Sequence, residues 1–317
     1  MFFRFFSLIS FFLFFELFSA YPFQEVWVYV LKGEEKFLKG GEPITDLVYF
    51  SAAVNEVGRI DKVPERIIRT PRVHLSISAP YNRSLMHWVL ARDLETRNEL
   101  IQDIVRATEQ YDGVNIDFEG ILPQDRNAYL SFLQEIKGKL PKGKIFSVAL
   151  PARTTERDDA FPYRKISEIA DKVFVMAYDQ HGRTEKPGEI ASLEWSARVG
   201  SFAQKTVPSE KLVMGMPLYG RVWQEQAVAQ ALKYPQTLEL LKKFSSAVVK
   251  RKNDGTGYFS FQQTVDATVY FEDMQSLGKK LEYYFKDGFK AVGFWRLGQE
   301  PAILWKKLHI DKAKHSQ

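Results

Sequence analysis

The chain has 317 residues, of which 45% are hydrophobic and 26% are charged, and its formal net charge is +5. This composition is that of a globular protein and excludes an intrinsically disordered chain. The sequence contains no cysteine, which excludes disulfides, a thiol nucleophile and cysteine-ligated zinc. The charge excess is small and no basic cluster carries interleaved aromatic residues, so nothing indicates nucleic-acid binding.

The first segment, residues 1–20, has the layout of a secretory signal peptide. Arg4 precedes a Phe-rich apolar run that ends in small residues. Glu16 interrupts this run and Phe18 stands where a small residue is preferred before cleavage, so an uncleaved membrane anchor and a buried N-terminal strand stay open. No second apolar run approaches the roughly 20 residues that a membrane span needs. We expect export to the periplasm, cell envelope or extracellular space, no stable membrane span after cleavage, and a monomer.

From residue 21 onward, short apolar strands alternate with helical stretches. The expected strands are 26–30, 46–51, 73–78, 113–119, 145–151, 172–179, 211–220 and 291–298. Helical patterns lie between most of them and are clearest over 94–110, 125–140 and 193–206. This alternation predicts right-handed crossovers and a parallel sheet. Eight such strands in about 300 residues predict a closed (β/α)8 TIM barrel over 21–317.

The interval before the last strand is longer than the others. Two strand-like runs within 247–263 surround the turn cluster NDGTG, which predicts a hairpin. A further strand is expected at 267–273, followed by the helical stretch MQSLGKKLEYYFKDG. We therefore expect a small α+β insertion at about 222–270, between strand seven and helix seven of the barrel.

The strand at 113–119 has an unusual pattern, because three apolar residues alternate with Asn115, Asp117 and Glu119. Successive side chains on a strand point to opposite faces. In a parallel barrel the apolar face packs under the helices, and the polar face climbs the interior toward the carboxyl-terminal rim, where barrel enzymes keep their chemistry. Two carboxylates in such an interior hold a proton, which raises at least one apparent pKa. A carboxylic acid that stays protonated near neutral pH is what a general acid requires.

Two alternatives compete with this interpretation of the carboxylate pair. Such a pair on an alternating strand is also typical of the solvated face of an antiparallel sheet. A metal site is the second alternative, but no histidine lies nearby in the sequence to support it. The rhythm of strands and helices argues against the solvated face, because parallel strands are rarely exposed on one side.

Four segments carry a resemblance to a known family. DGVNIDFE resembles the D-G-x-D-x-D-x-E signature of family 18 glycoside hydrolases, the chitinase-like barrels. The segments FVMAYDQHG (174–182), LVMGMPLYG (212–220) and AVGFWRLG (291–298) are similar to the family's segments on strands six, seven and eight. With asparagine at 115, the chain looks closest to the bacterial spore-cortex and peptidoglycan N-acetylglucosaminidases and the lysosomal chitobiases. The resemblance covers nearly the whole barrel.

The resemblance implies a catalytic role for three residues. Glu119 would be the general acid, Asp117 would orient the substrate's acetamido group and support an oxazolinium ion, and Tyr178 would donate a hydrogen bond to the acetamido carbonyl. The nucleophile in this family is the substrate's own acetamido oxygen. The resemblance therefore implies retention of anomeric configuration, with no metal and no cofactor.

The resemblance also implies a set of residues around the substrate, comprising Asp179, Met176, Trp295, Tyr219, Asn115 and Asp112. Met176 and Asp179 would line the cleft, and Trp295 would form the floor under the sugar at the cleavage site. Asp112 and Asn115 would support the strand below.

Other aromatic and histidine residues admit more than one role. An aromatic residue on a strand is usually core, but at a strand's carboxyl end it stacks against sugar faces in many proteins. Both roles stay open for Tyr219 and Trp27. Trp223 is a candidate wall of the cleft, and His181 lies in a rim loop where substrate contact is open. Trp195 is expected to pack within its helix layer.

We therefore expect an exported retaining glycoside hydrolase that cleaves β-1,4 bonds at N-acetylglucosamine in peptidoglycan-type glycan. One alternative is a chitinase or chitobiase that acts on soluble chito-oligosaccharides. A second is a carbohydrate-binding relative without catalysis, but such relatives usually lose the glutamate that stands here as Glu119. The expected partner is a glycan that contains N-acetylglucosamine, with no nucleic acid, and endo or exo cleavage stays open.

Overall fold

The computed structural model describes residues 20–69, 71–224, 228–262 and 266–311. Its centre is a closed barrel of eight strands, each parallel to its neighbours, in the order β14-β2-β3-β4-β5-β6-β7-β8. The barrel strands are β2 (Glu25–Leu31), β3 (Asp46–Ala53), β4 (Arg72–Ser78), β5 (Gly113–Asp117), β6 (Ile145–Pro151), β7 (Lys172–Met176), β8 (Leu212–Pro217) and β14 (Ala291–Trp295). The predicted (β/α)8 barrel is confirmed, and all eight strands lie where the sequence predicts them.

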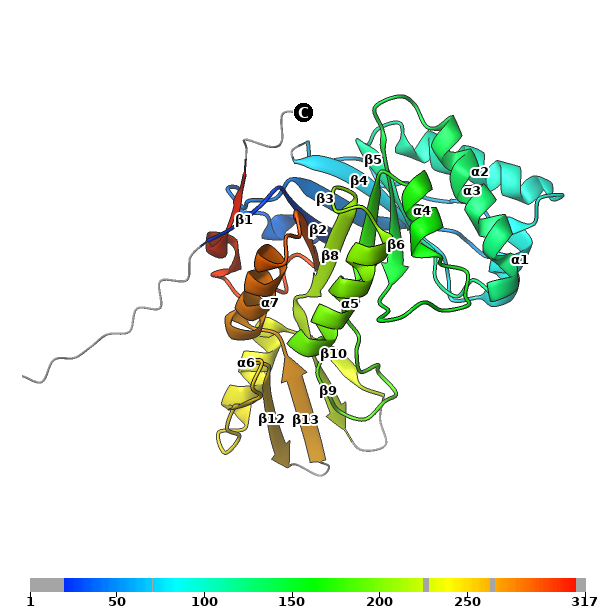
Figure 1. The fold of residues 1–317 in the computed structure, drawn as a ribbon. Helices are drawn as coiled ribbons and strands as arrows, with labels where there is room; N and C mark the ends of the chain where they lie inside the picture. Colours follow the sequence, from blue (N-terminus) through cyan, green and yellow to red (C-terminus); the bar gives the residue numbers. More distant parts are fainter. Residues whose placement is uncertain (1–19, 70, 225–227, 263–265, 312–317) are drawn as a thin grey trace, which may run out of the picture.

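The outer helices cover the barrel unevenly (Figure 1). They are α1 (Arg83–Leu90), α2 (Glu95–Thr108), α3 (Arg126–Lys139), α4 (Tyr163–Ile169), α5 (Leu193–Thr206) and α7 (Met274–Lys286). Short 3-10 helices lie at Glu35–Phe37, Pro123–Asp125 and Leu304–Lys307. The described residues between β3 and β4 form no helix. A short parallel pair, β1 (Tyr21–Phe23) with β15 (Leu308–Ile310), joins the two ends of the described chain.

Two apolar regions hold the barrel together. One lies between the strands and the helices and includes Val114, Ile116 and Phe118, the apolar residues that alternate with the carboxylates. The other fills the barrel interior and includes Tyr29 and Phe174. The alternation read from the sequence therefore separates the outer packing layer from the interior of the barrel, as a parallel barrel requires.

The insertion forms a second lobe beside the barrel (Figure 1). Its antiparallel sheet has the order β10-β9-β13-β12-β11, and helix α6 (Tyr234–Lys243) accompanies it. The strands are β9 (Tyr219–Gln224), β10 (Gln230–Lys233), β11 (Lys250–Arg251), β12 (Gly257–Gln262) and β13 (Asp266–Phe271). The expected strand 211–220 is two strands of different sheets, because β9 starts two residues after β8 ends. Local alternation does not show which partner a strand pairs with.

Residues 1–19 of the expected leader lie outside the described residues. Within the described ranges, no helix combines the length and the apolar content that a membrane crossing requires.

Close packing in the barrel interior depends on two glycines. The ring of Phe174 lies against Gly293 of β14 and Gly215 of β8. A Cβ atom at 215 would lie 2.6 Å from Phe174 Cε1, and a Cβ atom at 293 would overlap the same ring more severely. Interiors packed at crystal-like density do not absorb an added methyl group without shifts of side chains or backbone.

We predict that Gly293→Ala lowers the free energy of unfolding by about 1–3 kcal/mol, because the new methyl group collides with the Phe174 ring. Urea denaturation measures this loss. Adding Phe174→Leu should cost less in the Gly293→Ala background than in the parent, since the smaller side chain makes room. The control is Gly138→Ala on α3, where no atom lies within 4 Å of the added Cβ. Additive losses in the double variant would contradict the packing argument.

Candidate active site

A layer of hydrogen-bonded polar groups inside the barrel supports the carboxylates of β5. Asn115 is fully buried, and its side-chain oxygen accepts hydrogen bonds from the hydroxyls of Tyr29 at 3.0 Å and Ser76 at 3.1 Å. Its side-chain nitrogen donates to Ser147 Oγ at 3.1 Å. These bonds fix the amide between strands β2, β4, β5 and β6. Asn115 therefore supports Asp117 from below and does not reach the cavity.

Asp117 and Glu119 differ sharply in their surroundings. Asp117 ends β5 and is only 8% exposed, and its Oδ1 has no hydrogen-bond partner among the described residues. Burial, followed by the negative charge of Glu119, raises the pKa of Asp117 to about 7. Glu119 lies just beyond the strand and is exposed, and burial of its carboxyl and the charge of Asp179 raise its pKa. The two groups therefore retain a proton close to neutral pH, as the sequence predicts.

The end of β7 forms the facing wall. Met176 and Tyr178 are half-buried and line the cavity. Burial raises the pKa of the Tyr178 hydroxyl well above its usual value, and neighbouring Tyr29 and Asp117 act in the same direction. Tyr178 is therefore a neutral hydrogen-bond donor at physiological pH.

Asp179 is held by the insertion. Its backbone has φ of 61°, the only positive value at a non-glycine residue in the described ranges, and such a conformation costs about 1–3 kcal/mol. The Tyr219 hydroxyl donates to Asp179 Oδ1, and Arg221 Nη2 donates to the same oxygen at 2.8 Å. Arg221 Nη1 also donates to the His181 carbonyl at 2.7 Å. Strand β9 thus fixes the rim loop after β7. Tyr219 is almost fully buried and is not among the residues that line the cavity, so its contribution to the site is to hold the Asp179 carboxylate in place.

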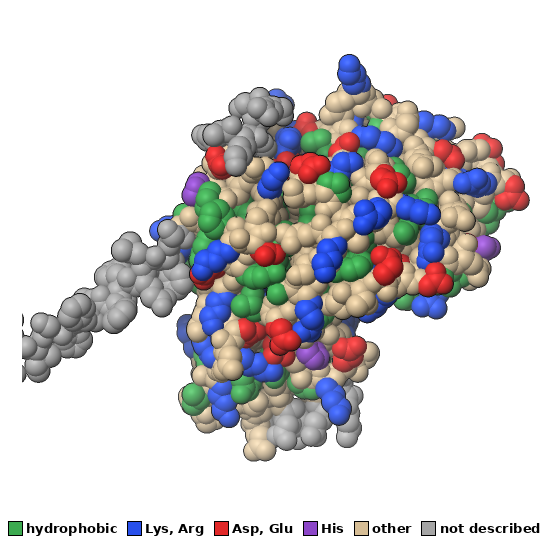
Figure 2. Space-filling view, viewed as in Figure 1, with side chains coloured by type: hydrophobic (Ala, Val, Ile, Leu, Met, Phe, Trp, Pro, Cys, Tyr) green, Lys and Arg blue, Asp and Glu red, His purple; other side chains and the backbone are tan. Residues whose placement is uncertain are grey.

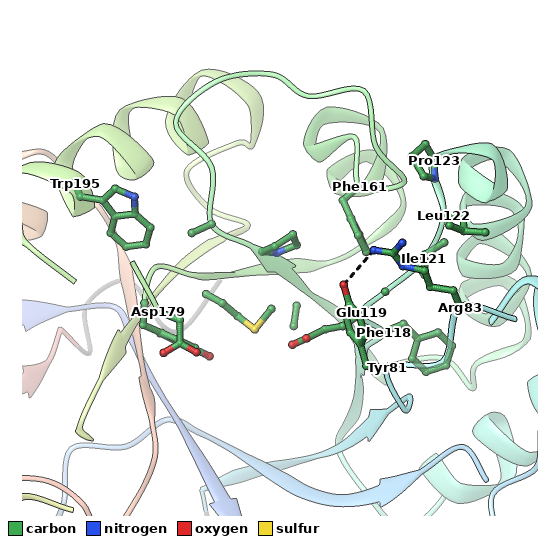
Figure 3. A pocket seen from close by; sticks show the side chains of 16 residues that line it. Tyr81, Arg83, Phe118, Glu119, Ile121, Leu122, Pro123, Phe161, Asp179 and Trp195 are labelled. Carbon is green, nitrogen blue, oxygen red and sulfur yellow. Dashed lines mark hydrogen bonds between the residues drawn. The ribbon is translucent and has the colours of Figure 1, made fainter. Parts of the chain in front are cut away.

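The cavity between these walls measures about 660 Å³ (Figure 3). It is lined by Tyr81, Arg83, Phe118, Glu119, Gly120, Ile121, Leu122, Pro123, Ala149, Pro151, Ala152, Phe161, Met176, Tyr178, Asp179 and Trp195. Trp195 lines it from α5, although the sequence suggests only helix packing. The sequence analysis also missed Tyr81 and Arg83. Both follow the carboxyl end of β4, and that position at the rim is the signal that identifies them.

The other tryptophans occupy different environments. The Trp295 ring is half-buried and lies with its centroid 5.2 Å from that of Tyr29 and 5.0 Å from that of Phe50, in the interior cluster that Tyr178 also contacts. Trp27 is core, since it is fully buried and stacks on His74. Trp223 is buried within the insertion interface and is not among the lining residues of the cavity.

Asp112 does not belong to the cavity, contrary to its place among the expected substrate-binding residues. It precedes the amino end of β5, whereas Glu119 follows the carboxyl end, so the two lie at opposite ends of the barrel. Its carboxylate pairs with Arg66 at 2.6 Å and accepts the backbone N–H of Val73 at 2.8 Å. The family signature spans the whole strand, so its first residue has a structural role at the base.

Within the described ranges, no three histidine, cysteine or acidic side chains are grouped closely enough to hold a metal ion. His181, which the sequence placed in a rim loop, uses Nδ1 to contact the Glu189 carbonyl at 2.9 Å.

A closed parallel barrel with a proton-retaining carboxylate pair at its carboxyl-terminal rim, beside an aromatic-lined cavity, has the architecture of a barrel enzyme's active site. Residues 26–300 match the model of the family described as glycosyl hydrolases family 18. The match covers most of the sequence, and the chain belongs to this family.

Similar curated proteins include two from bacilli. The chain is 28% identical over 258 residues to the putative sporulation-specific glycosylase YdhD of Bacillus subtilis, covering 77% of this chain and 61% of the relative. It is 26% identical over 234 residues to the cortical fragment-lytic enzyme of Bacillus anthracis, covering 69% of this chain and 54% of the relative. The chain thus spans about half to three fifths of the length of these curated relatives.

Solved structures share the fold. The spore cortex-lytic enzyme SleL of Bacillus cereus superposes with a TM-score of 0.81 at 22% identity, covering 91% of this chain and 74% of that structure. A chitinase from Chromobacterium violaceum superposes with a TM-score of 0.78 at 18% identity, covering 90% and 98% of the two chains. At these identities the likeness concerns the fold alone.

The raised pKa of Asp117 predicts how stability changes with pH. The pKa of Asp117 is about 7 in the folded state and 3.8 when the group is unperturbed, so the unfolded state loses this proton first as pH rises. The contribution of Asp117 to stability is therefore greatest below about pH 4 and falls until pH passes about 7. Asp117→Asn should therefore be more stable than the parent by up to about 4 kcal/mol above that window, with the gap closing at low pH.

Urea denaturation at about pH 4 and about pH 8 measures the gap. Asp93→Asn, at an exposed loop position, is the control and should show no pH-dependent gap. A difference between Asp117→Asn and the parent that stays constant across this range would contradict the raised pKa.

Proposed function

We propose that the chain is an exported, retaining glycoside hydrolase that cleaves β-1,4 bonds at N-acetylglucosamine in peptidoglycan-type glycan by substrate-assisted catalysis. The observation that carries this proposal is the pair of Asp117 and Glu119 at the carboxyl-terminal rim. Burial raises the pKa of both groups, and the charge of Glu119 acts further on Asp117 while the charge of Asp179 acts further on Glu119, so the pair keeps a proton near neutral pH. Membership of the glycosyl hydrolase family supports it independently.

The first step transfers a proton and breaks the glycosidic bond. Glu119, which is exposed to the cavity, gives its proton to the glycosidic oxygen as the bond from that oxygen to C1 breaks. The substrate's acetamido oxygen attacks C1 from the other face and forms an oxazolinium ion. Asp117, through its unpaired Oδ1, accepts the acetamido N–H, and the neutral Tyr178 hydroxyl donates to the acetamido oxygen.

The second step restores the enzyme. The Glu119 carboxylate takes a proton from water, whose oxygen forms the new bond to C1 while the oxazolinium ring opens. Two inversions at C1 give net retention. No carboxylate nucleophile is needed, which agrees with a wall opposite Glu119 built from Met176, Tyr178 and a salt-bridged Asp179.

Peptidoglycan-type glycan is favoured as substrate by the relatives. Those that carry names of an activity include a cortical fragment-lytic enzyme and a sporulation-specific glycosylase. Asparagine at 115 and the segment GFWRLG resemble the wall-hydrolase branch of the family. The signal-like segment 1–20 would deliver the enzyme to the envelope, where this glycan lies.

A chitinase or chitobiase that acts on soluble chito-oligosaccharides is the second candidate. It is favoured by a curated relative, the class V chitinase CHIT5 of Lotus japonicus, to which the chain is 26% identical over 271 residues. A binding protein without catalysis is disfavoured, because Glu119, Asp117 and Tyr178 are all present and gathered at one end of the barrel.

We predict that Glu119→Gln lowers turnover of a chromogenic chitobioside about 10²–10⁴-fold, because an isosteric amide has no proton to give. Binding of the sugar and thermal stability should remain close to those of the parent. Glu168→Gln, at an exposed position on α4, is the matched control and should retain full activity. Turnover by Glu119→Gln within a few-fold of the parent would show that another group is the acid.

The substrate is tested by incubating the enzyme in parallel with purified peptidoglycan and with chitotriose. We expect soluble fragments that carry N-acetylglucosamine at the reducing end, identified by mass spectrometry after reduction. Peptidoglycan left intact beside rapid cleavage of chitotriose would replace the proposed substrate with the second candidate.

A further inference from the structure

The cavity contains a single positive charge among its described lining residues. Glu119 and Asp179 are its carboxylates, and Arg83 is its only cation. Arg83 is the first residue of α1 and is exposed. It faces the cavity from the side opposite Asp179, with Glu119 between them (Figure 3).

Tyr81 and Gly120 place this arginine beside the general acid. Gly120 follows Glu119 directly and has φ of +70°. A Cβ atom at 120 would lie 3.2 Å from the Tyr81 ring, so the ring rests on the Gly120 backbone. The Arg83 guanidinium lies 5.8 Å from the centre of that ring, and its Nη2 donates to the Tyr81 hydroxyl at 3.4 Å. The 70% exposure of Tyr81 leaves this pair open to a ligand.

Arg83 has no structural task that explains its position. It forms no ion pair with any described carboxylate. Five other arginines do form such pairs, namely Arg66, Arg72, Arg153, Arg221 and Arg296. The pKa of Glu119 is raised by burial and by Asp179, so Arg83 does not serve to keep Glu119 ionised. Its guanidinium has five N–H donors in a planar fork suited to a carboxylate, and one weak hydrogen bond uses only one of them.

Figure 2 shows how charged side chains are distributed on one face of the molecule. On the face shown, blue Lys and Arg side chains are interspersed with red Asp and Glu side chains over the helices. A mixed surface does not attract an anionic polymer strongly, and salt screens its field within about 10 Å. Recognition of an acidic glycan would therefore depend on a direct contact in the cavity.

Resting on the proposed function, we propose that Arg83 binds a carboxylate carried by the 3-O-lactyl substituent of the leaving sugar, and so selects an acidic glycan over neutral chitin. In a glycan that alternates N-acetylglucosamine with N-acetylmuramic acid, the leaving sugar is joined through O4. The lactyl group sits on the adjacent O3. A carboxylate there lies near the oxygen that Glu119 protonates, which is the region that Tyr81 and Arg83 border.

The carboxylate has two sources. It is the lactyl acid itself where the sugar carries no peptide, and it belongs to the attached peptide where the lactyl group is amidated. Both are anionic groups on the same arm of the same sugar, and both suit a guanidinium fork. The experiment separates them.

The experiment measures binding in the Glu119→Gln background by calorimetry at low salt. The probes are a peptide-free tetrasaccharide of alternating N-acetylglucosamine and N-acetylmuramic acid, its methyl ester, the peptide-bearing tetrasaccharide, and chitotetraose. We expect the free acid to bind about 5–20-fold more tightly than the ester, because a partly exposed charge-assisted hydrogen bond is worth about this ratio. Adding Arg83→Gln should reduce the ratio to less than about 2-fold, and Arg83→Lys should keep part of it.

Arg92→Gln, at an exposed position outside the cavity, is the matched control and should keep the full ratio of acid to ester binding. An Arg83 effect confined to the peptide-bearing glycan would assign the bound carboxylate to the peptide. A ratio that Arg83→Gln leaves unchanged, or no binding of any probe, would overturn the inference. Turnover by the parent is measured separately. If the parent cleaves the glycans but Arg83→Gln does not change the ratio of acid to ester binding, the proposed function stands and the inference fails. If binding is selective for the acid but no glycan is cleaved, the proposed function fails and the inference stands.

Discussion

The site depends on one unfavourable arrangement, a buried carboxyl group beside a second acid. Asp117 is held inside the barrel mouth on a layer of neutral hydrogen bonds centred on Asn115. Burial, followed by the negative charge of Glu119, raises its pKa to about 7. The fold tolerates this cost because eight paired strands and two apolar regions fix the strand on which Asp117 sits. Burying the Asp117 carboxyl group costs stability, and the same burial keeps a proton on the group near neutral pH.

The insertion belongs to the same arrangement. Arg221 and Tyr219 on β9 both donate hydrogen bonds to Asp179. Arg221 also donates to the His181 carbonyl, in the loop that follows Asp179. Asp179 in turn raises the pKa of Glu119. A lobe that looks like an appendage of the barrel therefore sets the position of a charge that acts on the acid. On the other side of Glu119, Tyr81 comes from the β4–α1 connection and Arg83 is the first residue of α1. The two walls thus originate from different parts of the chain and meet only at the rim.

Sequence reasoning succeeded where the pattern is local. The polar residues of β5, the segment that ends β7, and the longer interval before β14 all lie within a few residues of recognisable signals. It failed where a contact joins distant segments. Trp195 is an ordinary helix residue until α5 packs on the barrel beside β8, and only then does it line the cavity. Asp112 matches the signature, but the direction of the strand puts it at the opposite end of the barrel.

The eight strands, the side of β5 that carries the acids, and the family are all readable from the amino-acid sequence, because alternation and motif order are properties of neighbouring residues. Three features became visible only in the folded chain: which aromatic residues face the cavity, that Tyr219 bonds to Asp179, and that Arg83 is the one cation among the described lining residues. Closure of the barrel brings residues from separate strands to one rim, and no pattern of neighbouring residues records how their side chains meet there.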